Sequence, residues 1–289
     1  MKIGYPCINR TIGCTPNKTF RLASYSEKIL KEKIKQNLDC LKKTLEFNVK
    51  NNLLFFRIGS GLVPFASHPI CIFNWQRYFK KYFLEIGEYI KKNGFRISMH
   101  PDQFVLINSL KRDVIKKSIK ELNYHCDVLN LMDLDESAKV QIHVGGVYKN
   151  KNASLNRFIN NYKRLNKKIK KRLVIENDHM NFSFKDCLWI NKKIDIPIVF
   201  DVFHHECLNN NEKVRETVIR AKKTWKKKDG VLMVDYSNQK VGARKGSHEE
   251  NINLKKFKKF LRIARNIDFD IMLEIKDKEK SALKAIKLT

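Results

Sequence analysis

The sequence has few of the features that would place it in a familiar class at once. It carries six prolines and eleven glycines among 289 residues, and no Pro- or Ser-rich linker divides it into parts. Its seven cysteines are odd in number and scattered, with no Cys-x-x-Cys motif and no pattern of pairs. We therefore expect reduced thiols, as in a cytoplasmic protein, and no disulfide framework.

Long apolar runs are also missing. No stretch approaches the roughly 20 residues that span a bilayer, and the first residues lead into a strand-like segment without an apolar signal region. We expect a cytoplasmic protein with no membrane partner, associated with the nucleoid if the source is prokaryotic. No G-x-G-x-x-G or G-x-x-x-x-G-K-[ST] motif follows a strand-like run, so the usual nucleotide-binding loops are absent.

Negative charge is scarce. The chain has 30 Asp and Glu against 59 Lys and Arg, which gives a formal net charge of +29. Such an excess attracts polyanions over long range, so a phosphate-rich partner is a reasonable expectation. The alternative is that the lysines only keep the helix surfaces solvated. The net charge alone therefore does not establish that the partner is a nucleic acid. The hydrophobic content of 43% is enough for a sizeable core.

Short β-rich runs and helical stretches alternate along the chain. Strand then helix, eight times, predicts a (β/α)8 TIM barrel, which we expect to form a single domain over residues 1–289. An open doubly wound sheet is the alternative. The predicted strands are Lys2–Tyr5, Leu53–Ile58, Phe95–Met99, Val140–His143, Arg172–Glu176, Ile196–Asp201, Val231–Tyr236 and Asp270–Ile275. The predicted helices are Ser26–Val49, Trp75–Lys92, Asp113–Leu131, Leu155–Lys170, Phe184–Lys192, Glu212–Trp225, Leu254–Ile267 and Glu279–Ile286.

Histidines and carboxylates stand at or just beyond the ends of the predicted strands. In a (β/α)8 barrel these ends meet at one mouth, so the side chains are expected to form a single site. His, Asp and Glu together are ligands for divalent metals. One histidine by itself is more often structural than a ligand, but this pattern recurs at seven strand ends. The nine candidate ligands are His68, His100, His143, Glu176, Asp201, His204, Asp235, His248 and Glu274.

Nine candidates are too many for one ion that keeps an open position for substrate, so we expect two or three ions. Glu176 and Glu274 have two oxygens each and could bridge ions, and the i, i+3 spacing favours Asp201 and His204 as a pair facing the site. Mixed imidazole and carboxylate ligation suits Mn²⁺ or Zn²⁺ more than Mg²⁺. Clustered divalent ions favour phosphoester hydrolysis. His125, inside a predicted helix, is expected to be a surface or packing residue.

Eight motifs follow one another along nearly the whole chain: Gly4-Tyr5-Pro6-Cys7 with Asn9, Arg57-Ile58-Gly59-Ser60, Ser67-His68-Pro69, His100-Pro101-Asp102-Gln103-Phe104, Ile142-His143-Val144-Gly145-Gly146, Glu176-Asn177-Asp178, Asp201-Val202-Phe203-His204-His205 and Arg244-Lys245-Gly246-Ser247-His248. These motifs resemble those of the UV damage endonuclease family. The resemblance implies a TIM barrel with up to three metal ions, usually manganese, that cleaves DNA immediately 5′ to a cyclobutane dimer or 6-4 photoproduct. Abasic sites are a further expected substrate, through the likeness to barrel-type apurinic/apyrimidinic endonucleases.

The resemblance also implies roles for single residues. Gln103 and Phe104 would probe the duplex at the lesion, and Tyr5 would pack against displaced nucleotides. Asn9 and the basic loop residues Arg244 and Lys245 are further candidates for binding DNA. Catalytic roles are expected for the ligands Glu176, His143 and Glu274.

The chain departs from the family pattern at two places. The family commonly has Lys-x-His at the end of strand seven, where this chain has Met233-Val234-Asp235, and Gln-Tyr where it has Gln103-Phe104. Two other functions stay open: a barrel-type metal-dependent sugar isomerase or epimerase, and a catalytically silent relative that binds damaged DNA. The expected partner is double-stranded DNA with UV lesions, and a monomer is the default expectation.

Overall fold

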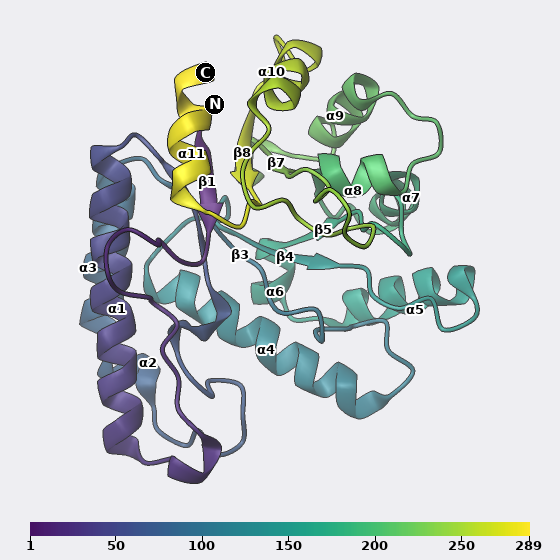
Figure 1. Cartoon of the computed structure of the whole chain (residues 1–289). Coiled ribbons are helices and arrows are strands. Elements are labelled where there is room, and N and C mark those ends of the chain that lie inside the picture. Colours follow the sequence, from purple (N-terminus) through teal and green to yellow (C-terminus); the bar gives the residue numbers. More distant parts are fainter.

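A closed barrel of eight parallel strands forms the centre of the molecule. A computed structural model describes residues 1–289. Each strand pairs with its neighbours in chain order, and β1 also pairs with β8, which closes the barrel (Figure 1). The (β/α)8 prediction is therefore confirmed. The strands are β1 Ile3–Pro6, β2 Phe55–Ile58, β3 Arg96–Met99, β4 Lys139–His143, β5 Leu173–Glu176, β6 Ile198–Asp201, β7 Leu232–Tyr236 and β8 Phe269–Leu273.

Helices surround the barrel, and their apolar faces pack against the strands (Figure 1). Two predicted helical stretches, Trp75–Lys92 and Leu155–Lys170, are each divided into two helices, Glu212–Trp225 and Leu254–Ile267 are shortened, and one short helix, α8, was not predicted. None of the helices combines the length and apolar character needed to cross a membrane. The α-helices are α1 Glu27–Lys50, α2 Trp75–Tyr78, α3 Lys80–Lys92, α4 Arg112–Leu131, α5 Lys151–Arg164, α6 Lys167–Arg172, α7 Phe184–Ile194, α8 Val202–Cys207, α9 Val214–Lys222, α10 Leu254–Ile263 and α11 Glu279–Ala285. Short 3-10 turns lie at Leu22–Ser24, Ser60–Leu62, Lys227–Asp229 and Ile286–Leu288.

The strand register brings polar residues together at one end of the barrel. His143 in β4 lies opposite Glu176 in β5, and Asp201 in β6 lies opposite Asp235 in β7. Because side chains alternate along a strand, the residue two positions earlier points to the same side. These earlier residues include Phe55, Val174, Val199, Met233 and Met272, which form a buried cluster separate from the 62-residue core beneath the helices. The interior of the barrel is therefore polar at the mouth and apolar in the layer beneath the mouth.

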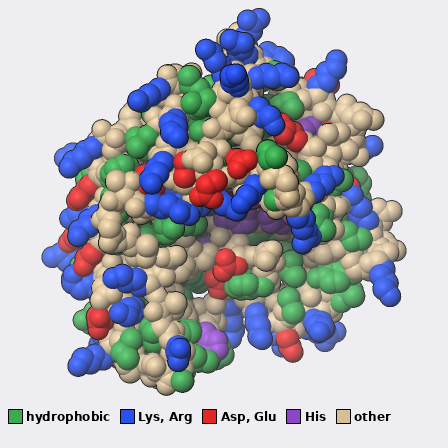
Figure 2. Space-filling model, in the orientation of Figure 1, with side chains coloured by type: hydrophobic (Ala, Val, Ile, Leu, Met, Phe, Trp, Pro, Cys, Tyr) green, Lys and Arg blue, Asp and Glu red, His purple; other side chains and the backbone are tan.

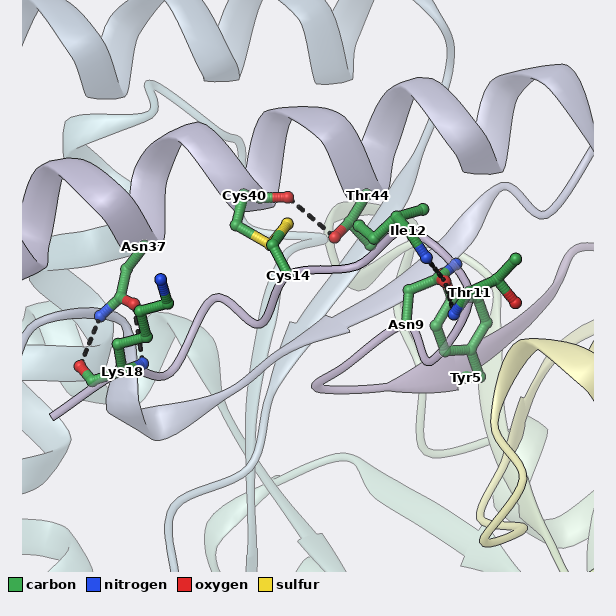
Figure 3. Close-up of a disulfide and its surroundings, with 9 residues drawn as sticks. All are labelled: Tyr5, Asn9, Thr11, Ile12, Cys14, Lys18, Asn37, Cys40 and Thr44. Atoms are coloured by element: carbon green, nitrogen blue, oxygen red, sulfur yellow. Dashed lines mark hydrogen bonds between the residues drawn. A yellow bond between two sulfur atoms is a disulfide. The ribbon is translucent and has the colours of Figure 1, made fainter.

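A disulfide joins the loop after β1 to α1 (Figure 3). It links Cys14 to Cys40 across 26 residues, with the two Cα atoms 6.0 Å apart. The prediction of reduced thiols was wrong for this pair, and the other five cysteines are free. The pair escaped prediction because one cysteine lies in an irregular loop and the other within a helix, so no short motif connects them. The disulfide holds the loop that leads away from the barrel mouth.

Candidate metal centre

Five of the nine predicted ligands converge at the mouth of the barrel. His100 follows β3, His143 ends β4, Glu176 ends β5, Asp201 ends β6, and His204 lies in α8. Their nitrogen and oxygen atoms form two groups, each with its candidate ligand atoms within 4.8 Å of one another. The first group is His100, His143 and Glu176; the second is Glu176, Asp201 and His204. Glu176 belongs to both groups and lies between them.

The Glu176 carboxylate is surrounded by imidazoles. Nε2 of His100 lies 3.2 Å from Oε2 of Glu176, and Nδ1 of His143 lies 3.7 Å from the same oxygen. On the other side, Nδ1 of His204 lies 2.9 Å from Oε1. The side chain of Glu176 is almost entirely buried. These distances leave the two oxygens of Glu176 facing different histidines, as a ligand shared by two ions requires.

The short helix α8 places His204 in the cluster. Asp201 caps this helix, because its Oδ1 accepts a hydrogen bond from the backbone N–H of His204 at 2.6 Å. The i, i+3 spacing therefore brings both side chains to the mouth. His205 points away: its ring packs on Phe200, and its Nε2 donates to the carbonyl of Glu212 at 3.0 Å.

Three buried polar atoms of the cluster have no hydrogen-bond partner. They are Nδ1 of His143, Oε1 of Glu176 and Oδ2 of Asp201. Buried polar atoms are rarely left unpaired in native proteins, and an ion that binds there is one explanation. All three residues belong to the two groups of candidate ligands. The donor set, imidazole nitrogen with carboxylate oxygen, therefore fits divalent ions at this position.

Electrostatic coupling within the cluster is strong. Burial alone raises the pKa of a carboxyl, but the imidazoles of His143 and His100 hold the pKa of Glu176 well below its ordinary value. Burial raises the pKa of Asp201 well above its ordinary value, which His204 offsets only in part. Burial lowers the pKa of His204, yet Asp201 and Glu176 together raise that pKa to about 11. The two carboxylates thus create a negative potential that holds a proton on His204 when no other cation is present.

Asp235 was a predicted ligand, but the structure places it against Arg57 instead. Nη2 of Arg57 lies 2.8 and 2.9 Å from the two oxygens of Asp235, and Nη1 contacts Glu274. Gln141 donates to Asp235 at 2.6 Å and to Glu176 at 2.6 Å. Burial raises the pKa of Asp235 to about 7, although the guanidinium opposes this. Burial raises the pKa of Glu274 as well, but the charge of Arg57 outweighs this effect and lowers that pKa to about 2.

Sequence reasoning missed Arg57 and Gln141 as members of this site. Both lie in strands, two residues before positions at the mouth, and both are buried. A charged or amide side chain inside a run that is otherwise apolar was the available signal. Arg57, in Phe55-Phe56-Arg57-Ile58, is the clearer of the two.

His248 and Glu274 lie at the edge of the cluster. Nδ1 of His248 donates to the backbone carbonyl of Glu274 at 2.8 Å, and its Nε2 lies 3.9 Å from Oε2 of that residue. The His248 ring lies 5.9 Å from the ring of His204. These two predicted ligands therefore adjoin the two groups without belonging to either of them. Together with Arg57 and His100 they line a cavity of about 390 Å³.

His68 is not brought into the cluster. It lies in the loop between β2 and α2, exposed to solvent, and its Nδ1 accepts a hydrogen bond from the backbone N–H of Ile70 at 3.1 Å. Its side chain lines a cavity together with Lys120 and Asp127. The structure thus places His68 apart from the other candidate ligands.

Tyr5 and Asn9 are not surface residues, which corrects the expectation that they bind DNA. The Tyr5 side chain is 0% exposed, and its hydroxyl donates to Oδ1 of Asn48 in α1 at 2.6 Å. The amide of Asn9 donates to the same hydroxyl at 2.8 Å, and its Oδ1 accepts from the N–H of Thr11 (Figure 3). Both residues hold the loop after β1 against α1, so neither is available for stacking on nucleotides.

The other predicted DNA contacts are exposed around the mouth. Phe104 is 61% exposed, and Gln103 beside it is also exposed, in the loop that follows His100. Arg244 and Lys245 are exposed in the loop between β7 and α10. Figure 2 shows histidine side chains in a central hollow, with Lys and Arg side chains and some Asp and Glu side chains along its rim. A negatively charged polymer would therefore meet positive charge before it reached the cluster.

Comparison with known proteins identifies the family of this chain. The family model described as UV-endonuclease UvdE matches residues 1–289. A UV DNA damage endonuclease of Clostridium perfringens (strain 13 / Type A) is 43% identical over 288 residues, which cover 99% of this chain and 70% of that protein. A protein of the same name from Bacillus thuringiensis subsp. konkukian (strain 97-27) is 34% identical over 282 residues, covering 94% and 89% of the two chains.

Solved structures extend the comparison. The crystal structure described as SacUVDE is 45% identical, has a TM-score of 0.95, and is matched over 100% of this chain and 97% of that chain. Endonuclease IV from Thermus thermophilus, with 12% identity, a TM-score of 0.64 and coverage of 100% and 97%, shares the fold. D-psicose 3-epimerase from Clostridium cellulolyticum, with 14% identity, a TM-score of 0.53 and coverage of 81% and 79%, does so too. On the full-length family match and the identity to these relatives, the chain belongs to the UV-endonuclease UvdE family.

Proposed function

We propose that this protein is a metal-dependent DNA repair endonuclease that hydrolyses the phosphodiester 5′ to UV photoproducts, with abasic sites as further substrates. Family membership supports DNA with UV damage as the substrate. The observation that carries the metal dependence is the set of unpaired buried atoms on His143, Glu176 and Asp201.

The two ligand groups would each hold one divalent ion, with Glu176 shared between them. Mn²⁺ suits this mixture of imidazole and carboxylate best, and Zn²⁺ and Mg²⁺ are the alternatives. When bound, such ions supply a hydroxide nucleophile near neutral pH and stabilise the charge that develops on a phosphoryl group. The protein's own contribution is to hold His100, His143 and His204 around one carboxylate in fixed positions.

DNA would bind across the mouth through phosphate contacts and one aromatic side chain. Arg244 and Lys245 are exposed, and neither forms an ion pair with an acidic residue, so both are free to contact phosphates. Phe104 projects from the loop that follows His100 and presents a ring for stacking on bases. A damaged step is already poorly stacked and costs less to open, so an inserted ring favours damaged over intact duplex.

Two other functions have weaker support. A sugar epimerase shares the fold and also uses carboxylates and histidines, but a small sugar needs neither the net charge of +29 nor an exposed phenyl ring at the mouth. A silent relative that only binds damaged DNA would not need three buried ligand atoms to remain unpaired. The cluster is therefore better explained by a catalytic role than by DNA binding alone.

Incision of an end-labelled duplex with one cyclobutane dimer, in the presence of Mn²⁺, tests the proposal. We expect a nick immediately 5′ to the dimer, and none in the same duplex without the lesion. Glu176→Gln and His143→Ala should abolish the nick and leave lesion binding, measured by anisotropy, within a few-fold of the native value. Tight binding without any nick would favour the silent relative. Epimerisation of a ketose, without incision, would favour the sugar enzyme.

A further inference from the structure

We propose that Arg57 and Asp235 form a built-in ion pair that takes the place of one metal ion, so that the cluster holds two ions and Asp235 is not a ligand. Arg57 then acts as a positioning residue for the shared carboxylate Glu176. The inference rests on the proposed metal dependence and specifies the number of ions and the residues that exclude a third.

Both oxygens of Asp235 are already satisfied. Oδ1 and Oδ2 accept from Nη2 of Arg57 at 2.8 and 2.9 Å, and Oδ2 also accepts from Nε2 of Gln141 at 2.6 Å. Asp235 is completely buried, yet neither of its oxygens is among the buried atoms that lack a partner. Glu176 and Asp201 each have one oxygen without a partner. Of these three carboxylates, Glu176 and Asp201 therefore each keep an oxygen without a hydrogen bond, and Asp235 does not.

The cation paired with Asp235 is the guanidinium of Arg57, which keeps its charge. A guanidinium stays protonated at any working pH, and its place beside Asp235 and Glu274 favours the charged form further. The residue is 2% exposed, and it also contacts Glu274 through Nη1. A divalent ion bound to Asp235 would lie close to this positive charge and would have to displace it. The β7 side of the barrel therefore offers no free ligand, since Met233 lies in the apolar cluster.

A hydrogen-bonded chain transmits the position of Arg57 to Glu176. Nη2 of Arg57 donates to Oε1 of Gln141 at 2.9 Å, which sets the orientation of that amide. The amide nitrogen of Gln141 then donates to Oε2 of Glu176 at 2.6 Å. This contact directs Oε1 of Glu176 toward Nδ1 of His204, which lies 2.9 Å away. Arg57 thus fixes the carboxylate that the two ligand groups share.

Metal stoichiometry of the purified full-length protein provides the test. The protein is stripped with chelator, dialysed against Mn²⁺, and analysed by plasma mass spectrometry, with titration calorimetry for affinity. We expect two ions per chain in the native protein and two in Asp235→Asn, with dissociation constants within about three-fold. The matched variant Asp201→Asn, also buried at a strand end, should hold one ion. Three ions in the native protein, or the loss of one ion in Asp235→Asn, would overturn the inference.

A separate measurement tests whether Arg57 positions Glu176 through Gln141. Gln141→Leu, which is close in volume, breaks the chain between Arg57 and Glu176 and should weaken Mn²⁺ binding at least ten-fold in an apo protein that still unfolds cooperatively. Gln141→Glu should not restore it, because the new carboxylate repels Glu176. Unchanged Mn²⁺ affinity in Gln141→Leu would overturn the positioning role. Failure of the native protein to bind any Mn²⁺ would refute the metal dependence itself, whereas three ions would refute only the ion pair's role.

Discussion

Nε2 of His125 lies 3.0 Å from Oγ of Ser60, a contact that joins the middle of α4 to the turn after β2. Nδ1 of the same ring faces the carbonyl of Glu121 at 2.8 Å and must donate to it, and Oγ of Ser60 also donates to the carbonyl of His100 at 3.1 Å. His125 is completely buried. It is therefore a packing residue, as expected, and it lies beneath the loop that carries part of the barrel mouth.

This buried histidine should make stability fall at acid pH. Burial lowers the pKa of His125 to about 4 in the folded protein, whereas an unfolded histidine titrates near 6.5. Between these values the unfolded chain binds a proton that the folded chain does not, so stability is full above pH 6.5 and decreases as the pH falls toward 4. The full difference is on the order of 3 kcal/mol.

Urea unfolding of the metal-free protein from pH 4 to pH 8 would measure this dependence. Other buried groups also titrate in this range, so the comparison is with His125→Gln, whose amide keeps a donor and an acceptor. The variant should have a flatter profile over the acid half of the range. Parallel profiles for the two proteins would show that His125 is not the group responsible.

Loss of metal should lower the melting temperature, and the effect should depend on Glu176. A ligand that binds only the folded state stabilises it by about 2.7 kcal/mol at 100 times its dissociation constant. Differential scanning fluorimetry with and without Mn²⁺ should therefore give a clear upward shift for the native protein. Glu176→Gln removes the shared ligand of both groups and should abolish the shift. An equal shift in this variant would place the ions elsewhere.

Phe104→Ala should weaken binding to damaged duplex without affecting metal binding or stability. Stacking of one base on an aromatic ring contributes about 1–3 kcal/mol, and truncation of an exposed ring removes little packing. Leu110 is the matched control, because it lies in the same loop, is also 61% exposed, and has no ring. Anisotropy with lesion-containing and intact duplexes should show a loss for Phe104→Ala on the lesion. Equal effects of the two substitutions would count against stacking.

Reduction of the Cys14–Cys40 disulfide should destabilise the protein. Closing a loop of 26 residues restricts the unfolded chain, and the chain-entropy model assigns this about 3–4 kcal/mol. A reductant should therefore lower the urea midpoint of the native protein. The double variant Cys14→Ser/Cys40→Ser should unfold at the same midpoint with and without reductant. A native midpoint that does not respond to reductant would contradict this assignment.

The fold was predictable because its determinants are local. Each strand is a short apolar run followed by a helical period, and all eight predicted strands coincide with β1 to β8 within about two residues at either end. The breaks between helices were harder to predict from the sequence. Asn166 caps α6 after a break at Leu165, and α8 consists of only six residues that depend on the Asp201 cap. Short helices of this kind are stabilised by tertiary contacts, and the hydrophobic periodicity of the sequence carries no information about such contacts.

The site was predictable only in part, for a similar reason. Residue type and strand-end position identified the two ligand groups around Glu176. Neither reveals that a carboxylate such as Asp235 is already paired, because Arg57 lies 178 residues away in the sequence. Tyr5 shows the same limit: an aromatic at a strand end can face solvent or core, and the contact with Asn48 in α1 decides for the core.

The closure of the barrel between β1 and β8 has a consequence for synthesis on the ribosome. The first strand pairs with the last, so the ring stays open until the residues of β8 have left the exit tunnel. His248 and Glu274 also belong to this late part of the chain, and Glu279 in α11 anchors the loop after β1 through the N–H of Arg10 at 2.9 Å. A nascent chain thus carries the ligands of both groups before it has the enclosure that arranges them. Incision activity should therefore require the release of β8 from the exit tunnel.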